Sequence, residues 1–179
     1  MRFCISAFLI PVFFLLTACG SSLPYLEAKS DPFIKTNYQA TDALIASANS
    51  AGHAMPPDMT MLVATLVNLD SLTESSRLGR VISEQVQARL TQRGYLVIEM
   101  KLRGQVFIKK DQGELLLSRE VQDLRKIHNA EAVVVGTYTV AKDYAYVNLK
   151  IIGSDNVAIG AHDYTLPLDR NIRSMLKQP

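Results

Sequence analysis

Residues 132–161 read AVVVGTYTVAKDYAYVNLKIIGSDNVAIGA, and this stretch decides the fold. It holds two runs rich in valine, isoleucine and tyrosine, residues 132–140 and 144–152, with the turn residues Ala-Lys-Asp between them. A second turn, Gly-Ser-Asp-Asn, precedes a third run that starts at Val157. Runs of this kind bounded by turn residues are typical of consecutive strands. The stretch predicts a three-stranded antiparallel meander, in which Gly136 marks a close backbone approach or a bulge.

The middle run of this meander alternates in polarity with a period of two residues. Aliphatic side chains occupy one set of positions: Ala145, Val147, Leu149 and Ile151. The other set is Tyr144, Tyr146, Asn148 and Lys150. This alternation predicts one buried face and one wet face. Tyrosines on a wet sheet face favour protein contacts, so Tyr144 and Tyr146 are candidate interaction residues. Packing of these rings under a helix is the alternative.

Apolar periodicity predicts a strand and a helix in the middle of the chain. Residues 61–69 form a continuous apolar run, which suits a strand covered on both faces. The helix that follows has one apolar stripe: Leu78, Val81, Ile82, Val86 and Leu90. It begins at a serine, either Ser71 or one of the pair at 75–76, and it ends at the Arg-Gly of residues 93–94.

Four weaker elements complete the fold. We expect a helix at 38–50, a strand at 95–100, a short strand at 106–108 and a helix at 118–128 that stops at Asn129. The sum predicts a single α/β domain with a mixed sheet of about five to six strands, three packed helices and the C-terminal meander. The predicted boundaries are a domain at 37–168 and a polar tail or frayed helix at 169–179.

The first residues of the chain indicate an export signal. Arg2 precedes an apolar run at 3–16, which contains Pro11 and is shorter than the roughly 20 residues of a membrane-spanning helix. The sequence Leu-Thr-Ala-Cys that ends at Cys19 resembles the lipobox of bacterial lipoproteins. This resemblance implies a signal peptide at 1–18, acylation of Cys19 with chains such as palmitate, and a lipid-anchored place at the outer membrane. Residues 19–36 would then be a lipidated tether.

Composition excludes several function classes. The chain has 179 residues, of which 48% are hydrophobic and 20% charged, as in globular proteins. Its formal net charge of +2 argues against a nucleic-acid partner. Cys4 leaves with the signal and Cys19 carries lipid, so the mature chain has no thiol for a disulfide, a nucleophile or a metal.

The lack of catalytic sequence patterns predicts that the protein is not an enzyme and uses no cofactor. The histidines are far apart in the sequence, and the motifs of serine hydrolases and nucleotide-binding proteins are missing. Glu114 and Glu120 are the best carboxylate pair for a glycan hydrolase, but Glu120 fits better at a helix start. Four arginines on the long helix indicate a solvated face or an anionic partner surface: Arg77, Arg80, Arg89 and Arg93.

Five segments in order resemble the FlgO family of flagellar outer-membrane proteins. They are VATLVNLD at 63–70, LGRVISEQ at 78–85, DQGELLLSR at 111–119, VVVGTY at 133–138 and YVN at 146–148. The resemblance implies a lipoprotein that supports flagellar assembly or motility through contacts with envelope or basal-body proteins, with no catalytic residue to carry over. It leaves a homo-oligomer open.

The segment at 111–119 is the most distinctive of the five. Gly113 suits a turn, Ser118 suits a helix cap, and Arg119 suits an ion pair with Glu114 or Asp111. The resemblance leaves open whether these five residues serve the fold or contact a partner.

A second function class remains. The general plan also resembles the curli-secretion lipoprotein and the lipoprotein activator of penicillin-binding proteins, which suggests a module that binds and regulates a cell-wall synthase or a secretion complex. Residues 20–36 would span about 55 Å fully stretched and about 25 Å as a relaxed coil. A tether of that reach favours a partner close to the outer membrane.

Overall fold

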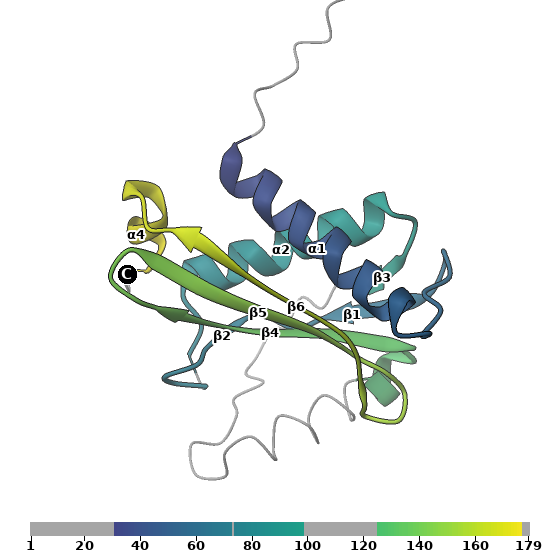
Figure 1. The fold of residues 1–179 in the computed structure, drawn as a ribbon. Helices are drawn as coiled ribbons and strands as arrows, with labels where there is room; N and C mark the ends of the chain where they lie inside the picture. Colours follow the sequence, from purple (N-terminus) through teal and green to yellow (C-terminus); the bar gives the residue numbers. More distant parts are fainter. Residues whose placement is uncertain (1–30, 73, 99–124, 177–179) are drawn as a thin grey trace, which may run out of the picture.

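The structure is a computed structural model that describes residues 31–72, 74–98 and 125–176. Its elements are α1 (Pro32–Ser50), β1 (Thr60–Val63), β2 (Val67–Asn68), α2 (Arg77–Gln92), β3 (Leu96–Ile98), β4 (Ala132–Val140), β5 (Tyr144–Ile152), β6 (Ala158–Pro167) and α4 (Arg170–Leu176). Residues 125–128 are also helical. The chain forms one α/β domain around a six-stranded mixed sheet, as the sequence predicts (Figure 1).

The sheet combines a parallel half and an antiparallel half. The strand order is β3-β1-β4-β5-β6, and β2 pairs with the second half of β4. β1 pairs in parallel with both β3 and β4, whereas β4, β5 and β6 pair antiparallel. The predicted meander is therefore confirmed, with its turns at the expected places.

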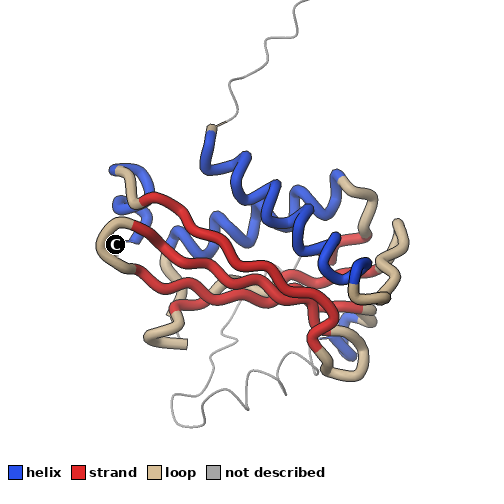
Figure 2. Tube along the Cα trace, viewed as in Figure 1, coloured by secondary structure: helices blue, strands red, loops and turns tan. Residues whose placement is uncertain are grey.

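Helices α1 and α2 lie on the same face of the sheet (Figures 1 and 2). The main core lies between this helical layer and the sheet. α1 packs closely over β6, because a Cβ added to Gly160 would lie only 3.0 Å from the Cβ of Ala48. In the same region the backbone N–H of Ala161 donates to Ser47 Oγ at 2.9 Å. The last strand of the sheet is thus covered by the first helix.

α1 begins six residues earlier than the sequence predicted. Asp31 caps it by accepting a hydrogen bond from the N–H of Phe33 at 2.9 Å, and Pro32 occupies the first turn. An aspartate cap followed by proline is a favoured helix start, since proline has no N–H to leave unsatisfied there. Residues 32–36, which the sequence assigned to the tether, are therefore helical.

The single strand expected at 61–69 is wrong, because β1 and β2 are separated by residues 64–66. Leu66 is completely buried in this break. Its N–H donates to Ser83 Oγ at 2.9 Å, and its carbonyl accepts from Ser75 Oγ at 2.7 Å. Side chains at the start of α2 thus replace the sheet partners that a continuous strand would have used.

Two glycines make room for this break. A Cβ on Gly79 would lie 2.5 Å from the carbonyl oxygen of Leu66 and 2.9 Å from the Tyr138 ring. A Cβ on Gly136 would lie 2.8 Å from both Leu66 Cγ and the Asn148 carbonyl oxygen. The pairing of β4 with β5 shows no register shift at Gly136, so the close-approach interpretation is confirmed and the bulge is wrong.

α2 follows the sequence prediction closely. Ser76 is its cap and accepts from the N–H of Gly79, so the later of the two proposed starts is correct and Ser71 is wrong. The helix ends at Arg93, and Gly94 follows with φ of +92°, a conformation that favours glycine.

The C-terminal segment forms a docked helix, α4. Its Ile172 is buried, and the Ile172 N–H donates to Asp169 Oδ1 at 2.8 Å. Arg77 of α2 donates to the Ser174 carbonyl at 2.7 Å. The helical alternative for this segment is therefore confirmed up to Leu176, and the polar-tail alternative is wrong there.

Several predicted elements fall on residues that the structure does not describe. The short strand at 106–108, the turn at 111–113 and most of the helix at 118–128 lie outside the described residues. The helical segment at 125–128 stops where the sequence predicted, since Asn129 has a left-handed φ of +54°.

Candidate interaction surface

Two of the predicted site residues lie on β5. Tyr144 is 47% exposed and Tyr146 is 51% exposed, while Ala145 and Val147 between and beside them are buried. The wet-face prediction is confirmed, and packing of these two rings under a helix is wrong. The other site residues lie outside the described part of the chain: Cys19, Asp111, Gly113, Glu114, Ser118 and Arg119.

The exposed tyrosines belong to the sheet face opposite the helical layer. Tyr146 pairs with Thr139 of β4 and Thr165 of β6, and directly opposite residues in antiparallel strands share a face. Leu69 lies at the margin of this surface, because its N–H donates to the carbonyl of Tyr138 at 2.8 Å. It is 54% exposed. We call the surface made by these residues the open face: Leu69, Thr139, Tyr144, Tyr146 and Thr165.

A row of polar side chains borders the open face. Thr137 pairs with Asn148, and Asn148 pairs with Asp163 across the three strands of the meander. The side-chain amide of Asn148 donates to Asp163 Oδ1 at 2.5 Å. Farther along the same side of the sheet, Leu62 and Val133 are buried with Ala130 in a second small cluster. Among the described residues, the exposed tyrosine rings of this side thus lie in the half away from this cluster.

Tyr138 of β4 has a structural role. It is buried on the helical side of β4, and its hydroxyl accepts from the N–H of Ser76 at 2.9 Å. This bond satisfies a free N–H at the start of α2. The ring therefore joins the sheet to the long helix and is not available to a partner.

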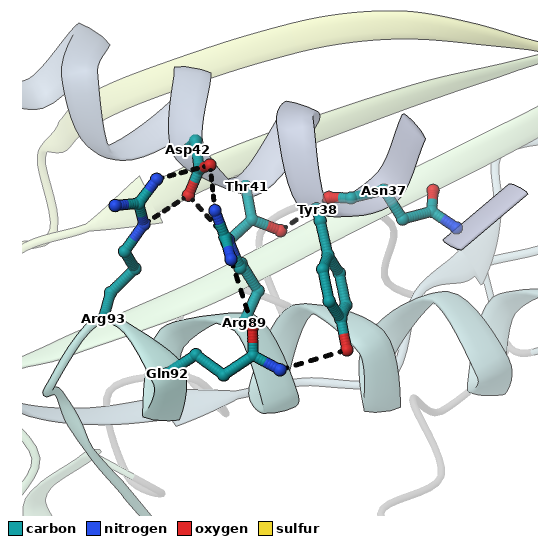
Figure 3. Close-up of polar contacts among 7 residues, drawn as sticks. All are labelled: Asn37, Tyr38, Thr41, Asp42, Arg89, Gln92 and Arg93. Atoms are coloured by element: carbon teal, nitrogen blue, oxygen red, sulfur yellow. Dashed lines mark hydrogen bonds and ion pairs between the residues drawn. The ribbon is translucent and has the colours of Figure 1, made fainter. Parts of the chain in front are cut away.

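The arginines at the end of α2 form ion pairs within the protein (Figure 3). Arg89 and Arg93 both bind Asp42 of α1, with nitrogen–oxygen distances of 2.6 Å to Oδ2. Arg89 also lies over the Tyr38 ring at 5.4 Å, and the Tyr38 hydroxyl accepts from Gln92. We call this set the α1–α2 junction: Tyr38, Asp42, Arg89, Gln92 and Arg93. Arg93 is exposed, as a solvated face predicts, whereas Arg89 is half-buried; the sequence did not predict that both pair with Asp42.

The ion pairs keep Asp42 charged. Hydrogen bonds from Arg93 and Arg89 hold the pKa of the Asp42 carboxyl well below its ordinary value. The sequence gives no local signal for this pairing, because Asp42 and Arg89 are 47 residues apart in the chain.

A second polar contact joins α1 to the sheet. Asn37 is buried, and its amide donates to Gln85 Oε1 at 2.5 Å. Its Oδ1 accepts from the Tyr164 hydroxyl at 2.6 Å. Burial raises the pKa of Tyr164 above its ordinary value, so this hydroxyl stays protonated as a donor. Neither Asn37 nor Tyr164 is among the predicted site residues.

Within the described residues, no three His, Cys, Asp or Glu side chains come together as a metal site would require. The helices described here include none with the length and apolar character needed to cross a membrane.

Comparisons with known proteins give a family and a fold. A family model described as "FlgO protein" matches residues 38–171. No curated protein matches significantly. The C-terminal domain of LpoB from Salmonella enterica is similar in structure, with a TM-score of 0.51 and 9% identity over 73% of this chain and 100% of that chain.

Two further solved structures are more distantly similar. The LpoB C-terminal domain from Escherichia coli has a TM-score of 0.49 and 10% identity, over 72% of this chain and 98% of its own. Lipoprotein GNA1162 from Neisseria meningitidis has a TM-score of 0.45 and 14% identity, over 65% and 84% respectively. Structural likeness at such identities shows a shared fold, whereas the family match covers most of the sequence. By that match, the chain belongs to the FlgO family.

Proposed function

We propose that this protein is an outer-membrane lipoprotein, anchored through Cys19, that supports flagellar assembly or motility by binding another envelope or basal-body protein through its open face. Membership in the FlgO family supports a lipoprotein at the outer membrane with a protein-interaction role. The choice of the open face as the contact surface rests on one observation: Tyr144 and Tyr146 are both exposed on the same side of β5.

The chemistry of the open face suits a protein partner. Tyrosine offers a large apolar ring and a hydroxyl donor, and it is enriched at protein interfaces. Thr139 and Thr165 flank Tyr146 with small hydroxyl side chains, and Leu69 adds an exposed aliphatic group. The strands beneath are held by a packed core, so the surface is rigid before it binds and loses little conformational freedom on binding.

A photo-cross-linking experiment in the native bacterium tests this proposal. A photoreactive phenylalanine replaces Tyr146 in one strain and Val157 in a matched control strain. Val157 is also an exposed apolar residue, but it lies in the turn before β6. We expect cross-links from position 146 to a flagellar basal-body or other envelope protein, and none to that protein from position 157. Equal capture from both positions would contradict the open face as the contact surface.

An anchoring control belongs to the same experiment. Replacement of Cys19 by serine removes the acylated thiol, and we expect the cross-link from position 146 to be lost or strongly reduced. If the mature protein carries no acyl chain by mass spectrometry, the anchor is wrong while the contact surface remains testable.

The second candidate function is a module that binds and regulates a cell-wall synthase or a secretion complex. The fold shared with the LpoB C-terminal domain allows it, although a shared fold does not carry a function. Cross-linking of position 146 to such a synthase or complex would favour this candidate over the flagellar one.

We also propose that the protein performs no catalysis. If the protein were a glycan hydrolase, Glu114 would be a candidate catalytic carboxylate. A Glu114→Gln variant should therefore support motility as well as the wild-type chain does. Loss of function in a variant that still folds and still cross-links to its partner would point to an enzyme.

A further inference from the structure

We propose that the solvent side of the helical layer docks on the membrane that anchors the protein, with Lys35 and the α1–α2 junction facing anionic phospholipid headgroups. This inference rests on the proposed anchor at Cys19, and it adds an orientation for the whole domain. The argument uses the charge of the junction, the apolar side chains beside it and the length of the tether.

The junction carries an excess of positive charge. Among the described residues, Arg89 and Arg93 share the single carboxylate of Asp42, so one guanidinium charge has no matching anion there (Figure 3). Lys35 lines the same shallow pocket as Asp42 and Arg89, a pocket of about 230 Å³. Because Asp42 stays ionised and arginine stays protonated, this excess persists over the whole physiological pH range.

The net charge of α1 and α2 together is also positive. With their caps, α1 and α2 carry these basic side chains: Lys35, Arg77, Arg80, Arg89 and Arg93. Their acidic side chains are fewer: Asp31, Asp42 and Glu84. Basic residues close to an anionic leaflet are attracted to it, and the attraction fades within a Debye length.

Apolar and amphipathic side chains lie among these cations. Ile34 is 36% exposed, and it lines the pocket with Tyr38 and Gln39. Tyrosine and isoleucine next to basic residues suit the interfacial zone of a bilayer, where one side of the surface meets headgroups and the other meets acyl chains. The buried side of α1 faces the sheet, with Leu44 and Ala48 in the core, so the pocket residues point outward.

The tether brings this surface close to the bilayer. Residues 20–30 separate the lipidated cysteine from the cap of α1 at Asp31. A relaxed coil of that length spans about 20 Å, and the fully stretched chain spans about 40 Å. The start of α1 is thereby held at a high effective concentration near the headgroups, where even weak attraction suffices to orient the domain.

Docking in this orientation has a consequence for the proposed contact surface. The open face lies on the side of the sheet opposite α1 and α2. With the helical layer on the membrane, Tyr144 and Tyr146 point away from the bilayer and toward a protein partner.

Fluorescence quenching on vesicles tests the docking without relying on acylation. The mature chain, residues 20–179, is attached through an N-terminal hexahistidine segment to a nickel-chelating lipid. A Gln39→Cys variant carries a single fluorophore, since this chain has no other cysteine. We expect acrylamide to quench this probe at least twofold less on phosphatidylglycerol-containing vesicles than on phosphatidylcholine vesicles. The difference should disappear in about 0.5 M salt, where charges are screened beyond about 4 Å.

Two matched controls locate the effect on the helical layer. A Thr165→Cys variant places the probe on the open face, and its quenching should be the same on both kinds of vesicle. A Lys35→Glu change should abolish the protection of the position 39 probe. The same charge change at Lys150, which is exposed on the other side of the sheet, should leave that protection intact.

Several outcomes would overturn the inference. Equal protection of the two probes, or equal protection on both vesicle types, excludes docking of this surface on anionic lipid. Protection that grows with the surface density of the protein on either vesicle assigns the surface to a second copy of the chain. Each of these results leaves the anchor at Cys19 standing, because the histidine segment replaces it here.

Discussion

The covered face and the open face of β5 are made by neighbouring residues of the same strand, yet their side chains meet different surroundings. On the covered face, Leu149 and Ile151 are fully buried beneath the helical layer. On the open face, Tyr144 and Tyr146 leave about half of their surface in water. Their backbones pair with β4 and β6 in the same continuous ladder, so backbone pairing does not distinguish them.

This difference separates the residues that hold the fold from those available to a partner. A substitution on the covered face changes contacts with packed atoms that cannot move far. One on the open face changes contacts with water. A shift of one residue along β5 should therefore turn a stability defect into a binding defect.

The largest expected effect on stability is that of Leu149→Ala. Leu149 is completely buried, and its truncation leaves a cavity between the sheet and the helices. Such changes cost about 3 kcal/mol in the free energy of unfolding. Urea denaturation followed by circular dichroism measures this loss. A loss below about 1 kcal/mol would mean that the covered face is loosely packed.

The second-largest loss of stability is expected from Gly79→Ala on α2. The added methyl would lie 2.5 Å from the Leu66 carbonyl oxygen, so α2 or the break between β1 and β2 must shift. We expect a net loss of about 2 kcal/mol, although alanine is intrinsically about 1 kcal/mol better than glycine in a helix.

The exposed Ala88 on the same helix is the matched control for that change. Ala88→Gly should cost about 1 kcal/mol through helix propensity alone. If Gly79→Ala proves stabilising, the close approach of α2 to Leu66 is wrong.

A smaller effect is expected from Asp42→Asn in the α1–α2 junction. The pair is partly exposed, with about 27% of the aspartate side chain accessible, so its loss at neutral pH should cost about 1 kcal/mol. Because the folded-state pKa of Asp42 is lowered, its contribution is present above the unfolded pKa of about 4 and is lost as the pH falls toward the folded-state pKa. The difference in stability between the wild-type chain and the variant should therefore shrink below about pH 4. Urea midpoints measured from pH 7 downward test this sign, and a difference that grows in acid would refute it.

The smallest effect on stability is expected from Tyr146→Ser on the open face. Half of this ring is already in water, so the free energy of unfolding should change by about 0.5 kcal/mol or less. The same variant should lose the partner recovered by cross-linking from a neighbouring open-face position such as Thr165. A stable variant that keeps the partner would separate the open face from binding.

The sequence predicted best the elements whose cause is local. The meander follows from a period of two residues and from its turns, and α2 follows from a serine cap, an apolar stripe and a terminal Arg-Gly. The outward direction of Tyr144 and Tyr146 follows from the same alternation. These signals need no knowledge of the rest of the fold.

The errors occurred where a distant segment determines the outcome. The break after β1 depends on Ser75, just before α2, and on Ser83, within α2, which both bond to Leu66. Likewise, the ion pairs of Arg89 and Arg93 with Asp42 form only because α1 lies beside α2, which the sequence does not indicate. The start of α1 is different, because its cause is local. The Asp31-Pro32 pair favours a helix start, although these residues were assigned to the tether.

The contact between Ser47 and Ala161 has a consequence for aggregation. β6 is one of the two terminal strands in the order β3-β1-β4-β5-β6, and an exposed sheet edge is a template on which a strand of another molecule can add. The Ser47 hydroxyl already occupies the Ala161 N–H, Asp163 places a charge on the same strand, and Pro167 at its end has no N–H to donate. This edge of the sheet is therefore protected against strand addition when copies of the protein are crowded together.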